Sequence, residues 1–329
     1  MLKTTLKQTR SYQLIRGYSH GQPRGVVDDE GGIIDVMVTW TKRAECKKSG
    51  LAEGCTLSGT TKNNMLGLID LAIAETNSAF NLSGVTTQLR LVHAYREPNY
   101  NEEATNAFGS ALSSIRRKTD GVLDDVHTLR NTYGADIVAM IIDDQEHCGM
   151  AYAGPQSDLM FSVTAWNCAT GYYSFGHAIG RNMVSFTRCE GRYSISNLVK
   201  AISNDHSFIC SFYHHILIIQ GCNKDKGSID ACSSKDKFNY GWRDPNAEFR
   251  SILASDCDTK QCDNMPKNEC TRVQRFSNEN HLYNGIAMGS PEHNNAKHMN
   301  QVKKEVAAYQ KVKIQPLATT KASYFIINS

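Results

Sequence analysis

The chain has 329 residues, a formal net charge of +3 and 21% charged residues, as expected for a globular protein of one large or two small domains. For this length, the charge is too small to indicate binding to nucleic acid. No apolar run is long enough to cross a membrane, so we expect no membrane span.

The first segment, residues 1–32, is basic and has no acidic residue before Asp28. It lacks the apolar core of a signal peptide. We expect a tail or the remnant of a propeptide, and three origins stay open: a disordered tail, a transit peptide, or a truncated gene model. We prefer truncation, because the remaining sequence has features of an exported protein.

Strand and helix patterns alternate from Ile33 onward. A strand is indicated by β-branched apolar runs or by strict alternation, and a helix by apolar residues at i, i+3, i+4 and i+7. The predicted elements are strands at 33–41, 87–95, 135–143, 148–154 and 161–166, and helices at 62–80, 104–118, 122–132, 172–183 and 294–310. This order predicts an α/β sandwich with a mixed sheet.

Eleven cysteines are scattered through the chain. Their spacing contains no pair of C-x-x-C knuckles, so we expect disulfides and a secreted or extracellular protein rather than a structural zinc cluster. Cys46 and Cys55 flank a short loop and could pair. The other pairings cannot be deduced from the sequence.

The run "HAIGRNM" begins at His177. In the H-E-x-x-H motif of zinc proteases, two histidines share a helical face and the glutamate between them is the general base. Here Ala178 takes the glutamate position and Arg181 the second histidine position. Taken alone, one histidine on a helix is most often structural.

The wider sequence resembles the metzincin zinc metallopeptidases, in particular the reprolysin-like (ADAM-like) and peptidyl-Asp metallopeptidase-like members. The matching segments include "IIDVMVTWT", "GLIDLAIAETNSAF", "DDVHTLRNTYGADIVAMIIDD", "FSVTAWNCATGYYSFGH" and "RVQRFSNENHLYNGIAMG". This resemblance implies an α/β (α+β) catalytic domain at 33–313, followed by a tail at 314–329. It also implies a twisted mixed five-stranded sheet with helices, followed by a smaller, irregular, cysteine-rich C-terminal subdomain.

The family pattern continues as H-E-x-G-H-N-x-G-x-x-H, and this chain interrupts it after Met183. Joining "HAIGRNM" to "GCNKDKG" restores the pattern, with Gly221 as the turn glycine and Lys224 at the third histidine position. Residues 184–220 are then an insertion. We interpret it as a retained intron, since valine codons begin with GT and a glutamine codon can end in AG; a genuine loop is the alternative.

The resemblance implies zinc and peptide-bond hydrolysis for the family. A catalytic zinc needs three protein ligands and a water, and of the three matching positions only His177 can ligate, since arginine and lysine are cationic. The general base is lost at Ala178, and Leu253 occupies the methionine position of the Met-turn. We therefore expect a pseudoenzyme that binds no zinc.

Other functions stay open. One is a protein that binds peptides or carboxylates, using a cationic patch of His177, Arg181 and Lys224 and a cleft along the strand at 148–154, where metzincins pair their substrate as an added strand. Another is a decaying gene product. A third is an active enzyme misrepresented by a faulty gene model. The partner is expected to be a peptide or protein, and the oligomeric state cannot be deduced.

Overall fold

The computed structural model describes residues 32–102, 106–144, 146–184, 239–254 and 270–310. The strands are β1 (Ile33–Trp40), β2 (Gln88–Arg96), β3 (Ile137–Ile142), β4 (Gly149–Ala151), β5 (Phe161–Ala165), β6 (Phe249–Arg250), β7 (Thr271–Arg272), β8 (Asn278–Tyr283) and β9 (Ile286–Met288). The helices are α1 (Lys42–Lys48), α2 (Gly59–Leu82), α3 (Ala107–Arg116), α4 (Asp125–Tyr133), α5 (Ser174–Met183) and α9 (Asn295–Val306), with a 3-10 turn at Ser157–Leu159.

The predicted mixed five-stranded sheet is confirmed. Its strand order is β2-β1-β3-β5-β4. β1 is parallel to β2 and β3, β3 is parallel to β5, and β4 runs antiparallel to β5 at one edge. The strands at the core of the sheet carry apolar residues in nearly every position, as expected when both faces of a sheet are covered.

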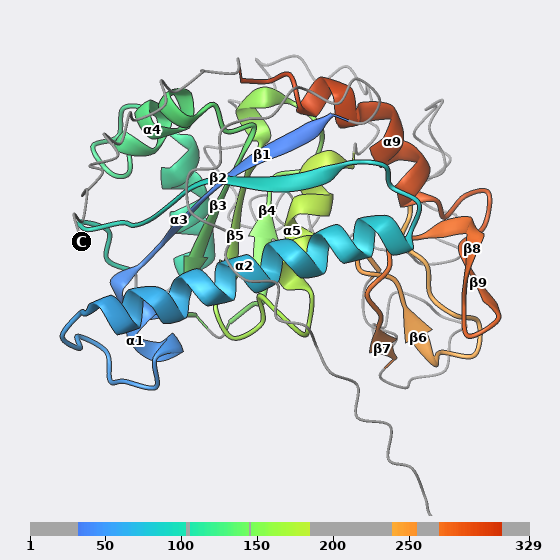
Figure 1. Cartoon of the computed structure of the whole chain (residues 1–329), viewed down its shortest axis with the longest axis horizontal. Coiled ribbons are helices and arrows are strands. Elements are labelled where there is room, and N and C mark those ends of the chain that lie inside the picture. The colour runs from blue at the N-terminus through green and yellow to red at the C-terminus, as the bar shows by residue number, and fades with distance from the viewer. Residues whose placement is uncertain (1–31, 103–105, 145, 185–238, 255–269, 311–329) are drawn as a thin grey trace, which may run out of the picture.

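Helices cover both faces of this sheet (Figure 1). Along β3 the side chains alternate between two cores, because successive residues of a strand point to opposite faces. Ile137, Ala139 and Ile141 belong to the core with α2, α5 and α9, whereas Val138, Met140 and Ile142 belong to the core with α3 and α4. The sheet is therefore the middle of three layers.

The long helix α2 has a clear start. Ser58 Oγ accepts the backbone N–H of Thr61 at 3.2 Å, and Thr61 Oγ1 accepts the N–H of Ser58 at 3.0 Å. This reciprocal pair is a capping box, which satisfies two backbone donors at a helix start. The sequence predicted this helix at 62–80, and the cap extends it to Gly59.

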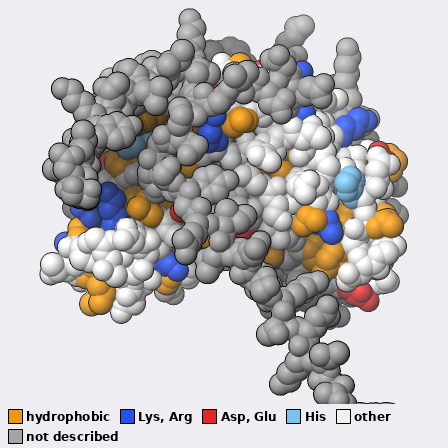
Figure 2. All heavy atoms as spheres, viewed as in Figure 1, with side chains coloured by type: hydrophobic (Ala, Val, Ile, Leu, Met, Phe, Trp, Pro, Cys, Tyr) orange, Lys and Arg blue, Asp and Glu red, His pale blue; other side chains and the backbone are white. Residues whose placement is uncertain are grey.

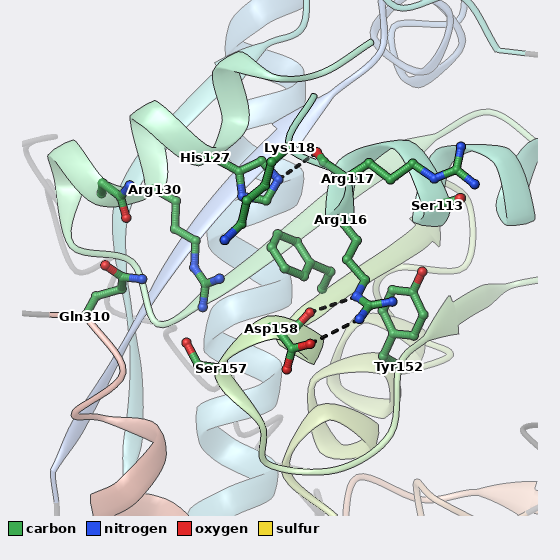
Figure 3. A pocket seen from close by; sticks show the side chains of 12 residues that line it. Ser113, Arg116, Arg117, Lys118, His127, Arg130, Tyr152, Ser157, Asp158 and Gln310 are labelled. Atoms are coloured by element: carbon green, nitrogen blue, oxygen red, sulfur yellow. Dashed lines mark hydrogen bonds and ion pairs between the residues drawn. The ribbon is translucent and has the colours of Figure 1, made fainter. Parts of the chain in front are cut away.

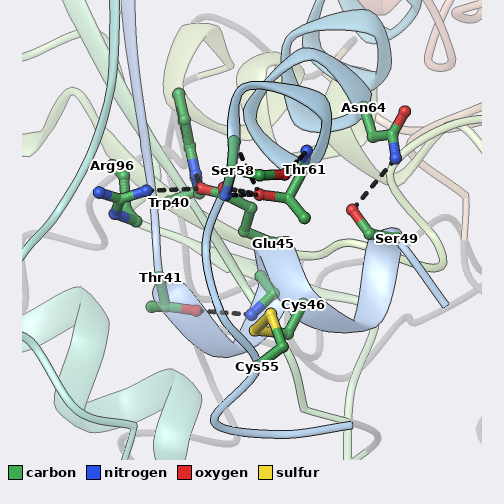
Figure 4. The surroundings of a disulfide bond; sticks show 11 residues. Trp40, Thr41, Glu45, Cys46, Ser49, Cys55, Ser58, Thr61, Asn64 and Arg96 are labelled. Atoms are coloured by element: carbon green, nitrogen blue, oxygen red, sulfur yellow. Dashed lines mark hydrogen bonds and ion pairs between the residues drawn. A yellow bond between two sulfur atoms is a disulfide. The ribbon is translucent and has the colours of Figure 1, made fainter. Parts of the chain in front are cut away.

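The expected pairing of Cys46 with Cys55 is confirmed (Figure 4). Cys46 lies inside α1, a short helix that was not predicted. Its neighbour Glu45 is fully buried and accepts hydrogen bonds from Trp40 Nε1 at 2.7 Å and Thr61 Oγ1 at 2.5 Å. These hydrogen bonds connect β1, α1 and α2. They also satisfy the carboxylate, which would be costly to bury without partners.

The described C-terminal segments add two short sheets, β6–β7 and β8–β9, and α9. They lie to one side of the main sheet in Figure 1. Their apolar residues Leu253, Phe276 and Met299 nevertheless belong to the core under α2 and α5. This part is therefore packed into the same core as the sheet.

Exposed large apolar side chains are few among the described residues: Leu51, Leu71, Val122, Tyr172 and Leu282. On the face shown in Figure 2, the described apolar side chains lie in several separate groups. Of the helices in the described ranges, none is both long and apolar enough to cross a membrane.

Candidate functional site

The run predicted to be an active-site helix is helical, as α5. It packs against β4 and β5 and begins after Tyr173, whose φ of 59° lies in the left-handed region, an uncommon conformation for a residue other than glycine. A second disulfide, Cys148–Cys168, joins the start of β4 to the loop that precedes α5. The helix is therefore fixed beside the edge strand of the sheet.

His177 on α5 is oriented by a backbone carbonyl from a distant segment. Its Nδ1 lies 2.7 Å from the carbonyl oxygen of Ile252. A carbonyl only accepts, so Nδ1 carries the proton and Nε2 keeps a lone pair. An imidazole held in this way is oriented as a metal-binding histidine is, with its second nitrogen bonded to the protein.

The His177 ring is neutral. Burial lowers its pKa well below the usual range, and Arg272, Arg181 and Arg250 lower it further, against a smaller opposing effect of the bond to Ile252. Desolvation and nearby positive charges both disfavour the imidazolium form. His177 therefore offers a lone pair and does not contribute a charge to the cationic patch that the sequence suggested.

Two of the predicted positions lie beside His177 on α5, inside the protein. Ala178 is 2% exposed and Arg181 is 7% exposed, and burial lowers the pKa of Arg181 to about 10. Arg181 is therefore buried rather than open at the surface, and the cationic patch of His177, Arg181 and Lys224 stays a prediction. The burial follows from position, since α5 lies between the sheet and the C-terminal segments.

Leu253, at the Met-turn position, lies beneath α5. A Cβ placed on Gly180 would lie 3.1 Å from Leu253 Cδ2, 2.7 Å from Phe276 Cε1 and 3.2 Å from Met299 Cε. Gly180 is thus required by close packing.

The structure does not describe the remaining predicted site residues, Gly221 and Lys224. Nearly all of the segment 184–220 also lies outside the described residues.

The chemistry of the side chains tests whether a zinc ion would fit. His177 supplies one nitrogen, and Arg181 at the i+4 position supplies a cation where a second ligand is needed. Within the described ranges, no three histidine, cysteine, aspartate or glutamate residues come together in a way that could hold a metal. The described residues around His177 therefore do not fit a catalytic zinc.

Two arginines near His177 could not be found from the sequence alone. Arg272 lies over the ring of Tyr172, with its guanidinium carbon 4.4 Å from the ring centroid, and donates to the Tyr172 carbonyl at 3.1 Å. Arg250 donates from Nη2 to the Tyr172 hydroxyl at 3.0 Å. Both arginines come from the short strands β6 and β7, and only tertiary packing brings them to α5.

Asn182 holds the loop between β4 and β5. Its Nδ2 lies 2.8 Å from the carbonyl oxygen of Tyr152, 3.1 Å from that of Leu159 and 3.1 Å from that of Phe161. The side chain is fully buried. In the sequence, the only signal for a role of Asn182 was its place in the "HAIGRN" run. In the structure, its side chain positions the edge strand.

Comparison with curated proteins finds relatives of one kind. Two come from Stenotrophomonas maltophilia, strains K279a and R551-3, and one from Xanthomonas campestris pv. campestris; each is called peptidyl-Asp metalloendopeptidase. They are 31%, 30% and 30% identical over 231, 230 and 228 residues. Each alignment covers 69% of this chain and 43%, 43% and 42% of the relative, so the chain spans less than half of their length. No family model matches the chain.

Comparison with solved structures finds a likeness to a chain in a structure of a chaperone–substrate complex. It has a TM-score of 0.52 and 13% identity and covers 86% of this chain and 36% of that one, which shows similarity of fold alone. A metalloproteinase-II from Bacteroides fragilis matches with a TM-score of 0.32 and 13% identity, covering 51% of this chain and 47% of that one. By sequence, the chain is related to metalloendopeptidases.

Proposed function

We propose that this chain is a metzincin-like metalloendopeptidase homologue that keeps a peptide-binding cleft and has lost zinc-dependent hydrolysis. The observation that carries the proposal is α5, where His177 is oriented by the Ile252 carbonyl at 2.7 Å while Ala178 and Arg181 are buried beside it. A zinc-bound water is the nucleophile of such enzymes. Without ligands and a general base, neither the water nor its activation is available.

The edge strand supports the retained cleft. β4 is the last strand of the sheet and pairs on one side with β5. An extended peptide can join such an edge through backbone hydrogen bonds. The disulfides further support a secreted protein, because disulfides persist in oxidising compartments.

The decisive measurement is the metal content of the purified protein by mass spectrometry, together with hydrolysis of peptides that contain aspartate. Such peptides are chosen because the relatives are called peptidyl-Asp metalloendopeptidases. We expect far less than one zinc per chain and no cleavage. One zinc per chain after exhaustive dialysis would overturn the proposal.

A repaired protein provides the matched control. It carries Ala178→Glu, Arg181→His and Lys224→His and lacks residues 184–220, so that the expected ligand positions follow one another as in the family pattern. We expect this variant to bind zinc. If it stays metal-free although it folds, the assignment of the ligand positions is wrong.

A second candidate function is the binding of an acidic peptide without cleavage. It is favoured by the three arginines, Arg272, Arg181 and Arg250, whose charges act on His177. Of these, Arg272 is the one that is partly exposed. An anion near His177 would therefore contact Arg272 first and be attracted by its positive charge.

Fluorescence anisotropy of a labelled aspartate-containing peptide at low salt tests this candidate. We expect Arg272→Gln to weaken binding, and Lys62→Gln, at an exposed lysine on α2, to leave it unchanged. Equal binding by all three proteins would contradict the role of Arg272.

Sequencing the transcript across residues 183–221 tests the proposed retained intron. Finding only unspliced reads would exclude it.

A further inference from the structure

A cavity of about 690 Å³ lies apart from His177, between the end of α3, the helix α4 and the segment that joins β4 to β5 (Figure 3). Its volume is within the range of small-molecule sites. Its charged lining is mostly basic: Arg116, Arg117, Lys118 and Arg130, with Asp158 as the carboxylate. His177, Ala178 and Arg181 do not line it, although Tyr152, from the segment at 148–154, does.

Two of the four cations are already paired. Arg116 donates from Nη2 to Asp158 Oδ2 at 3.1 Å and from Nε to the Asp158 carbonyl at 3.0 Å. Arg117 lies 3.9 Å from Asp120, and in Figure 3 its side chain points away from Arg130. The only carboxylate in the lining is therefore used by Arg116.

The other two cations retain capacity to bind an anion. Arg130 donates from Nε to the Ala135 carbonyl at 3.0 Å and from Nη2 to the Asp136 carbonyl at 2.6 Å, whereas its Nη1 has no partner among the described residues. Lys118 forms no ion pair within the described part of the chain. The two side chains reach toward each other in Figure 3, and both act on the charge of His127.

Burial makes the positive charge of Arg130 costly, and a bound anion would offset part of that cost. Arg130 is 5% exposed, and burial lowers its pKa to about 10 despite Asp136 and Asp158 nearby. Burial also lowers the pKa of His127, and Lys118 and Arg130 lower it further. Buried positive charges of this kind are stabilised by a counter-charge within hydrogen-bond reach.

The wall behind these groups is aromatic. The guanidinium carbon of Arg130 lies 5.0 Å from the centroid of Phe161, and the His127 ring lies 5.5 Å from it. Arg116 lies 5.0 Å from the ring of Tyr152. Cations held over aromatic rings are fixed in position. Phe161 is itself buried, whereas Tyr152 is partly exposed, so Tyr152 is the ring that offers an apolar surface to the cavity.

We propose that this cavity binds a small organic anion, with its phosphate or carboxylate group between Lys118 and Arg130 and its apolar part toward the ring of Tyr152. Two groups supply the recognition: Arg130 Nη1 as a fixed donor and the Lys118 ammonium as a point charge. Lys118 and Arg130 are separate from His177 and α5, so this proposal stands or fails separately from the proposed loss of zinc.

Isothermal titration of the full chain tests the proposal with phenyl phosphate and benzoate as the anions. Benzyl alcohol tests the requirement for charge, and inorganic phosphate tests the requirement for an apolar part. We expect one of the two aromatic anions to bind saturably at one site, more tightly than inorganic phosphate, and benzyl alcohol not to bind. The stronger of the two identifies the anionic group.

Charge reversal locates the site. Lys118 is exposed, so Lys118→Glu should fold normally, and we expect it to weaken binding about tenfold or more, equivalent to about 1.4 kcal/mol. Lys62→Glu makes the same charge change on an exposed lysine of α2 and should leave binding unchanged. Absence of binding by both anions, or unchanged binding by Lys118→Glu, would overturn the proposal. Loss of binding in Arg272→Gln alone would also overturn it, by moving the anion to the arginines near His177.

Discussion

At the scale of single residues, Gly180 shows how closely the candidate active-site helix α5 is packed. Gly180 lies on the side of α5 that faces Leu253, Phe276 and Met299, where a methyl group would approach a side-chain carbon to 2.7 Å. Core contacts this tight leave little room for an added group. Conservation of size at this point is therefore a requirement of the fold, whatever chemistry the helix performs.

We expect Gly180→Ala to lower the free energy of unfolding by about 1–3 kcal/mol, because the methyl group would overpack the core. The control is Gly67→Ala on α2, where a Cβ meets no atom within 4 Å, and there we expect a gain of about 0.5–1 kcal/mol from helix propensity. Urea unfolding of the three proteins measures both effects. A neutral Gly180→Ala would contradict the packing described for α5.

A buried carboxyl group couples stability to pH. Asp136 is 1% exposed; its Oδ2 accepts the N–H of Asp35 at 2.9 Å and its Oδ1 that of Gln310 at 3.1 Å. Burial raises its pKa to about 7, more than these hydrogen bonds lower it. The folded protein therefore holds this proton more tightly than the unfolded chain does.

It follows that the stability contributed by protonation of Asp136 is present below about pH 4 and is lost as the pH rises to about 7. Because Asp136→Asn removes this titrating group, its stability should fall less between pH 4 and pH 7 than that of the wild type. Asp70→Asn, at an exposed site on α2, should keep the wild-type slope. His293 contributes to the pH dependence of stability in the opposite sense, because burial lowers its pKa to about 4. This contribution is common to all the proteins and cancels in the comparison. Parallel urea-derived curves for Asp136→Asn and the wild type would contradict this assignment.

At the scale of elements, most of the main sheet and its helices could be predicted from the sequence. Strands such as β3 have apolar residues in every position, and α2 has a helical period over many turns, so local patterns are sufficient. The short helix α1 was missed because seven residues give too little periodicity. Arg250 and Arg272 were missed because their approach to His177 depends on tertiary packing of segments far apart in the chain.

The disulfide Cys148–Cys168 connects two elements of the candidate cleft, the edge strand β4 and the loop before α5. Its sequence separation is 20, against 9 for Cys46–Cys55. We expect replacement of Cys148 and Cys168 by serine to cost about 2–4 kcal/mol. By loop length alone, this is roughly 0.7 kcal/mol more than the loss of Cys46–Cys55.

Thermal or urea unfolding of the two double-serine proteins measures this difference. The Cys46–Cys55 variant serves as the matched control, because it also removes two sulfur atoms from a described disulfide. If the Cys148–Cys168 variant were as stable as the wild type, the covalent link would be redundant with the contacts of α5 with β4 and β5.

At the scale of the whole molecule, the described ties on α5 come from protein groups. They are the Ile252 carbonyl, the Asn182 amide, the Cys148–Cys168 link and apolar contacts from the C-terminal segments. Ligands that bind only the folded state raise its stability by an amount that grows with the logarithm of ligand concentration above Kd. If the metal site is lost as proposed, zinc should cause no such increase.

We therefore expect the midpoint of thermal unfolding to be the same with a chelator such as EDTA and with added zinc. Differential scanning fluorimetry gives this comparison directly. The repaired variant described above is the positive control, and its midpoint should rise with zinc. A wild-type midpoint that falls with chelator and recovers with zinc would contradict the loss of the metal site.

The ties that hold α5 also bear on how such a sequence can change over time. Because the ties described above do not involve the side chains of Ala178 and Arg181, the fold persists with residues there that cannot serve as a base or a ligand. The same tolerance of substitution also allows catalytic residues to be gained. A scaffold that tolerates lost chemistry also remains available for new chemistry, so α5 is a natural starting point for selecting a restored or altered catalyst in the laboratory.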